Sequence, residues 1–236
     1  MDGTESITLK KSGEHRSTRT VEAYPKMRSF RDYYIGMIFK PRRTFDALMA
    51  DSRRVKFGAL AVSITALLYT LFYFMASAAG GGPTTFKPWL AIPAEVYFQY
   101  NRFIVAPSMI LSWILAAAVA QLLCRLFSGK GSFEDNLSVL GFGIGIASWS
   151  TLVHDLTDGF LGFIGAINMK EYEAALNSPT IWRTLLWCLF AVYFIWYLLL
   201  FSKGIGAAQR LRRGPAIFVG VTTFLVYQFV YLIFNR

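Results

Sequence analysis

This chain of 236 residues carries little charge, and none in its long apolar runs. Aspartate, glutamate, lysine and arginine make up only 16% of it, against about a quarter of an ordinary soluble domain. The presence of only two cysteines excludes a disulfide-stapled secreted scaffold. The hydrophobic share of 55% excludes intrinsic disorder over most of the chain. The uncharged runs cover residues 57–79, 103–124, 137–153, 184–202 and 215–234.

These five runs have the lengths of membrane spans. A bilayer core about 30 Å thick is crossed by about 20 helical residues. Four runs have 19 to 23 residues, and the run at 137–153 is the shortest with 17. The sequence therefore predicts an all-α membrane protein, a five-transmembrane-helix bundle at residues 33–236 behind a flexible cytoplasmic tail at 1–32. Residues 1–31 lack an apolar core, so we expect no cleavable signal peptide.

Lysine and arginine are distributed unequally between the two sides of this bundle. One side, which includes the N-terminus, carries 19 of them and a net charge of +10, whereas the other carries five and a net charge of zero. Cytoplasmic loops hold the excess of basic residues, so we expect a cytoplasmic N-terminus and an outer C-terminus. This asymmetry explains the whole charge of the chain, and no nucleic-acid partner is expected.

A short amphipathic helix is predicted ahead of the first span. Pro41 suits the first turn of a helix, and Phe45, Leu48 and Met49 then share one face. Such a helix would lie in the inner headgroup layer. It is either an ordinary basic flank of a span or a specific surface for lipid or a partner. Further apolar anchors precede it, at Tyr33, Tyr34, Ile35, Ile38 and Phe39.

Three segments carry a family resemblance. Residues 40–48 have a Lys-Pro pair followed by a short amphipathic helix. Residues 128–142 form a glycine-rich loop that runs into a glycine-aromatic pair, and a basic loop at 203–213 precedes the last span. Together they resemble prokaryotic membrane proteins of the Yip family, over about residues 33–236. The resemblance implies five spans, a cytoplasmic N-terminus and no catalytic residues. Eukaryotic relatives interact with Rab GTPases, and their Asp-Leu-Tyr-Gly-Pro segment is absent here.

The resemblance and the charge asymmetry favour a non-enzymatic scaffold, adaptor or membrane-organising factor of the inner membrane. Its expected partners are the lipid bilayer and a cytoplasmic or membrane protein, and no cofactor is expected. Gly141 and Gly145 are four residues apart, a spacing that favours close helix packing. The predicted surface for a partner or lipid consists of Lys40, Pro41, Arg42, Arg43, Phe45, Gly129, Lys130, Gly131, Phe133, Arg212 and Arg213.

One cluster in the sequence resembles a metal or proton site. His154 and Asp158 are four residues apart and can share a helix face with Asp155 nearby. Zinc takes three or four ligands, and the outer side offers further carboxylates at Glu95, Glu171 and Glu173. A metal-dependent membrane enzyme is the function that this reading implies. The alternative is a solvated helix end that stops the third span at the outer headgroup level.

A small-solute or lipid transporter is the remaining alternative. Spans without ionisable residues disfavour coupled ion transport. A pathway would therefore have to be lined by uncharged polar groups such as Gln121, Ser148 and Gln228. The two cysteines, Cys124 and Cys188, are expected at different depths and so cannot form a disulfide.

Overall fold

The computed structural model describes residues 29–82, 89–90 and 92–235. This part of the chain is helical, with one 3₁₀ turn at Ala94–Val96, and contains no strand. Most of the predicted tail, residues 1–28, lies outside the described residues, and the first helix already begins at Phe30. The helices are α1 (Phe30–Phe39), α2 (Pro41–Met49), α3 (Arg54–Ala78), α4 (Tyr97–Leu126), α5 (Phe133–Ala147), α6 (Trp149–Phe163), α7 (Met169–Asn177), α8 (Ile181–Gln209) and α9 (Arg213–Phe234).

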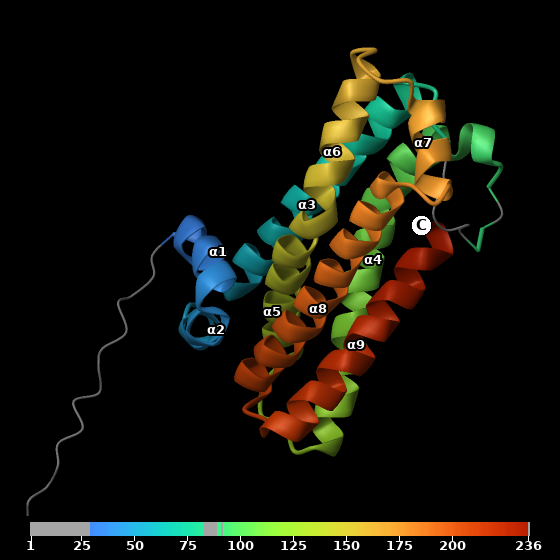
Figure 1. Cartoon of the computed structure of the whole chain (residues 1–236). Coiled ribbons are helices and arrows are strands. Elements are labelled where there is room, and N and C mark those ends of the chain that lie inside the picture. The colour runs from blue at the N-terminus through green and yellow to red at the C-terminus, as the bar shows by residue number, and fades with distance from the viewer. Residues whose placement is uncertain (1–28, 83–88, 91, 236) are drawn as a thin grey trace, which may run out of the picture.

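The long helices lie side by side, with α7 at one end and α1 and α2 on one flank (Figure 1). Four of them, α3, α4, α8 and α9, are long and apolar enough to cross a membrane. The pair α5 and α6 meets the same criterion when it is taken as one bent span. The prediction of an all-α, multi-pass membrane protein is confirmed.

The third span differs from the single helix predicted at residues 137–153. It begins four residues earlier and ends ten residues later, as two helices that meet at Ser148 with a bend of 47°. The Ser150 hydroxyl donates to the Ala147 carbonyl oxygen at 2.7 Å. The Thr151 hydroxyl donates to the Ser148 carbonyl oxygen at 3.3 Å. Hydroxyl groups that bond to helix carbonyls in this way bend helices, which accounts for the break.

The backbones of α3 and α5 lie in close contact. A Cβ atom on Gly141 would strike the carbonyl oxygen of Gly58. A Cβ atom on Gly145 would lie 2.9 Å from the Cβ of Ala61. Both glycines thus lie where two helix backbones approach too closely for a side chain, as small residues allow in membrane bundles.

The amphipathic helix predicted at Pro41–Met49 is present as α2, but its apolar face contacts protein. Phe45 and Leu48 are fully buried. The Phe45 ring fits over Gly204 of α8, where a Cβ would lie 3.2 Å from its tip. The glycine provides the room for the ring, so the apolar face of α2 is covered by the bundle and not by lipid. The exposed apolar face belongs instead to α1, at Ile35, Ile38 and Phe39.

Helix α1 is fixed to the break in the third span. The Tyr34 hydroxyl donates to the carbonyl oxygen of Gly145 at 2.6 Å. The same hydroxyl accepts a hydrogen bond from Trp149 Nε1 at 2.6 Å. Phe30 of α1 stacks on Phe142 of α5, with 5.8 Å between the ring centroids. A helix outside the spans therefore contacts both halves of the bent one.

Candidate functional site

The basic end of the bundle is the end where α3, α5 and α9 begin and where α4 and α8 end (Figure 1). It gathers most of the surface predicted for a partner or lipid. Five of those residues are exposed, namely Lys40, Arg42, Lys130, Arg212 and Arg213, and three are half-buried, namely Pro41, Arg43 and Phe133. Phe45, Gly129 and Gly131 are buried and therefore do not belong to the exposed surface.

Gln209, the last residue of α8, holds the loop at residues 127–132 inside the basic end. Its Oε1 accepts from the Gly131 N–H at 3.0 Å. Its Nε2 donates to Gln121 Oε1 and to Asn136 Oδ1, both at 3.0 Å. Asn136 in turn donates to Gln121 Oε1 at 2.8 Å. This neutral network is reciprocally satisfied, which makes it a rigid junction of α4, α5 and α8.

Two ion pairs fix the entry of the chain into α3. Arg54 Nε lies 2.5 Å from Asp135 in the first turn of α5. Arg53 lies 3.0 Å from Asp51, which also accepts from the Tyr33 hydroxyl at 3.1 Å. Hydrogen bonds from Arg53 lower the pKa of Asp51 to about 2. Burial, followed by the bond to Asp51, raises the pKa of Tyr33 to about 12.

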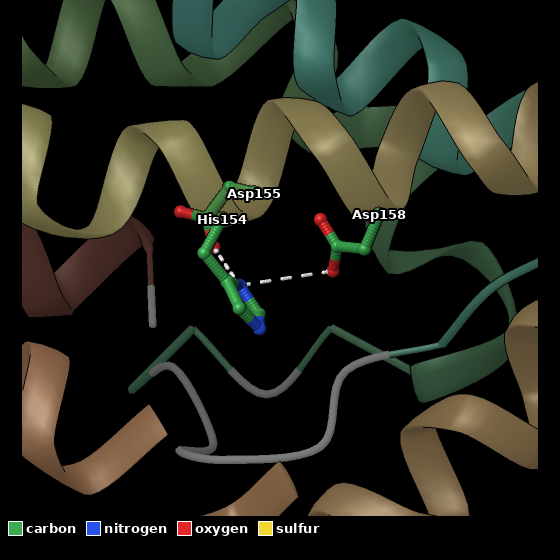
Figure 2. Close-up of side chains that lie close together, drawn as sticks. All are labelled: His154, Asp155 and Asp158. Atoms are coloured by element: carbon green, nitrogen blue, oxygen red, sulfur yellow. Dashed lines mark hydrogen bonds and ion pairs between the residues drawn. The ribbon is translucent and has the colours of Figure 1, made fainter. Parts of the chain in front are cut away.

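At the opposite end, three metal-ligating side chains of α6 converge (Figure 2). His154 Nδ1 is 3.2 Å from Asp155 Oδ1 and 3.9 Å from Asp158 Oδ2. One ligand atom of each residue lies within 4.8 Å of the others. One interpretation of the sequence placed the cluster at a helix end that stops the third span. Helix α6 instead continues to Phe163, so the cluster lies inside a helix.

Helix α7 holds the other nitrogen of this histidine. Tyr172 Oη lies 2.8 Å from His154 Nε2. Burial and the nearby carboxylates of Asp158 and Asp155 raise the pKa of Tyr172 to about 12, so the phenol stays protonated at neutral pH. The sequence did not point to this tyrosine, because it lies on a separate short helix.

The cluster lines a cavity of about 110 Å³ whose other walls come from α3, α4, α7, α8 and α9. Tyr69 lines its α3 side, nine residues before the end of that helix, which is about 14 Å along the axis. The cavity therefore lies within the bundle. Of the predicted further ligands, Glu173 lines the cavity and accepts from the Gly82 N–H at 2.7 Å, whereas Glu95 and Glu171 are exposed.

The polar side chains proposed for a transport pathway are bonded to other protein groups. Gln121 belongs to the network of the basic end. Ser148 Oγ lies 2.8 Å from Tyr197 Oη, and Gln228 donates to Tyr193 Oη at 3.0 Å. These contacts join helices, which is the commoner use of such residues in membranes. They supply no particular support for a transporter.

Both cysteines are free thiols, as predicted. Cys124 is buried in α4 among small residues of the bundle. Cys188 is exposed on α8.

The apolar helices and the bent pair, with two short helices docked ahead of them, define a multi-pass integral membrane protein. Within that class the chain belongs to the Yip1 domain family, whose domain it matches over residues 35–234. The membership of the Yip family predicted from residues 40–48, 128–142 and 203–213 is thereby confirmed, whereas its prokaryotic branch stays a prediction. No match was found among curated proteins or among solved structures.

Proposed function

We propose that this chain is a non-enzymatic scaffold of the inner membrane that captures an acidic segment of a partner protein on its basic end. The observation that carries this proposal is the gathering of basic side chains from three separate segments. Arg42 belongs to α2 and Lys130 to the loop before α5, while Arg212 caps the start of α9 and Arg213 is its first residue. All four are exposed.

The rigidity of the basic end supports this proposal. Gln209 fixes the loop that presents Lys130, and Phe45 anchors the helix that presents Arg42. A preorganised surface loses less entropy when it binds. Under the positive-inside rule this end faces the cytoplasm of a prokaryotic cell. An acidic segment is the complementary partner, because opposite charges speed association and favour the right orientation.

The test is photo-crosslinking in cells from the position of Asp46, an exposed residue of α2. We expect the wild-type chain to give a discrete protein adduct. The quadruple change R42Q, R43Q, R212Q and R213Q removes four charges and should remove that adduct. The matched change to four lysines keeps the charges and should retain most of it.

An adduct of equal yield in the glutamine variant would show that the basic end does not capture the partner. Crosslinking only to anionic lipid would identify the surface as a headgroup site and would also contradict the scaffold proposal. Membrane insertion of every variant is checked first, because Arg212 and Arg213 also contribute to orientation.

A further inference from the structure

We propose that the cavity at the opposite end binds one divalent metal ion of the zinc type, held by His154 Nδ1 and by one carboxylate oxygen each of Asp155 and Asp158. Zinc accepts nitrogen and oxygen ligands together. The proposal does not depend on the scaffold function, because it concerns the other end of the bundle.

The geometry of the three ligand atoms suits this ion. Zinc–nitrogen and zinc–oxygen bonds of about 2.0–2.2 Å place neighbouring ligand atoms about 3.4 Å apart in a tetrahedral site. The distance from His154 Nδ1 to Asp155 is 3.2 Å and that to Asp158 is 3.9 Å. The longer distance requires a movement of only about 0.5 Å to reach the tetrahedral value.

Tyr172 provides the second contact that a ligating histidine needs. A metal at Nδ1 leaves the ring proton on Nε2, and Tyr172 Oη lies 2.8 Å away in position to accept it. Ligating histidines almost always donate their other N–H to an oxygen, which fixes the ring and its tautomer. This contact comes from α7, so metal binding would stabilise the packing of α7 on α6.

The charge of the cavity also calls for a cation. The two proposed carboxylate ligands, Asp155 and Asp158, line the cavity together with a third carboxyl group, that of Glu173, against one imidazole, that of His154. Among the described residues that line the cavity, none is lysine or arginine. Buried charges are paired or coordinate metals, and a divalent ion balances both carboxylates. Ionisable groups inside a span usually mark a functional site.

The space beside the cluster makes the proposed site an exchangeable one. Three protein ligands leave the fourth position of a tetrahedral zinc site open. The cavity of about 110 Å³ lies beside the ligand atoms and has room for water. Structural zinc sites have four protein ligands, so we expect a chelator to remove this ion without unfolding the chain.

The test is zinc titration of the full chain in detergent, after treatment with a chelator. We expect one zinc per chain by calorimetry and by elemental analysis. The change D158N should weaken binding by more than 100-fold, and Y172F by about 10- to 100-fold with unchanged stoichiometry. The matched control E171Q removes an exposed carboxylate of α7 and should bind like the wild type.

Cobalt(II) gives a readout that does not depend on any variant. In the wild-type chain it should produce the strong visible absorption of a four- or five-coordinate site, and zinc should displace it. Failure of the wild type to bind zinc at one per chain, or equal binding by D158N, would overturn the proposal. Proton uptake near neutral pH with no zinc binding would identify a proton site and would also overturn it.

Discussion

The two halves of the third span, α5 and α6, have 15 residues each and opposite characters. Every residue of α5 from Ser138 to Ala147 is buried, and its glycines lie against the backbone or side chains of neighbouring helices. Helix α6 alternates between buried and exposed residues and carries the histidine and both aspartates of the cluster. Helix α5 has glycines where it meets α3 and α8, whereas α6 has ionisable side chains at its cavity.

This difference assigns the two halves of one span to different roles, α5 to the stability of the fold and α6 to the binding of a ligand. Backbones that touch leave no space for a ligand, as at Gly141 and Gly58. Polar side chains that hold a helix away from its neighbours leave a cavity, as at His154 and Asp158. Changes in α5 should therefore affect folding, whereas changes in the cluster of α6 should affect binding.

The largest effect is expected from Gly141→Ala in α5. The new methyl group would strike the carbonyl oxygen of Gly58, and overpacking of this kind typically costs about 1–3 kcal/mol. We expect the free energy of unfolding in detergent to fall by about 2–3 kcal/mol. Gly214→Ala is the matched control, because a Cβ there meets nothing within 4 Å. Equal stability of the two variants would contradict the backbone contact.

The next effect concerns the network that holds the start of α5. Gln209→Leu leaves Gly131 N–H and the amide of Asn136 without their present partner, which should cost about 2 kcal/mol. Gln228→Leu removes one bond, to Tyr193, from a site between two spans, and should cost about 0.6 kcal/mol. Denaturant titration of both variants compares the two losses directly. A larger loss for Gln228→Leu would show that the network is not the stronger junction.

A smaller effect is expected where the two halves meet. Tyr34→Phe removes the bonds to Gly145 and Trp149, at a cost of about 1 kcal/mol. Hydrogen exchange should increase in α1 and around Ser148. Tyr100→Phe is the control, since that side chain is 59% exposed. Unchanged exchange around the break would mean that α1 does not restrain it.

Loss of the zinc ligand should hardly change the stability of the metal-free chain. Asp158→Asn has the same shape and relieves repulsion between two carboxylates, so we expect a change of less than about 0.5 kcal/mol in chelator. With zinc at 100 times its Kd, the wild type should gain about 2.7 kcal/mol and the variant nothing. Thermal unfolding with and without zinc measures both differences. Strong destabilisation of metal-free D158N would give α6 a structural role like that of α5.

The smallest effect on stability is expected at Asp51, which lies outside both halves of the third span. Its pKa of about 2 is below the value of about 3.9 in an unfolded chain. The stabilisation is therefore complete above about pH 4 and is lost as the pH falls towards 2. Asp51→Asn should lower stability slightly at neutral pH and converge with the wild type in acid. Asp46→Asn, which removes an exposed carboxyl of α2, is the control variant.

Four of the predicted spans fall on long apolar helices, because the bilayer sets the length of such runs. The prediction shortened the third span because charged residues, Asp135 and Asp155 among them, bounded the uncharged run. The fold accommodates these charges: Asp135 caps α5 and pairs with Arg54, and Asp155 faces His154. The spacing of the cluster was visible in the sequence, whereas the cavity beside it depends on six helices.

Several contacts that hold the bundle together connect segments far apart in the chain. Tyr34 is 111 residues from Gly145, and Gln209 is 78 residues from Gly131. Helical periodicity in the sequence cannot predict such pairs, because it shows only which residues share one face of one helix. The burial of Phe45 was missed for the same reason, since it depends on a glycine in α8.

The position of Tyr34 gives the N-terminal helices a mechanical connection to the interior. Its hydroxyl forms hydrogen bonds on both sides of the bend between α5 and α6. Tyr34 itself belongs to a helix that lies outside the spans. Helix α1 therefore contacts Trp149, in the first turn of α6, directly. His154 follows five residues later, about 7.5 Å along the axis of the same helix.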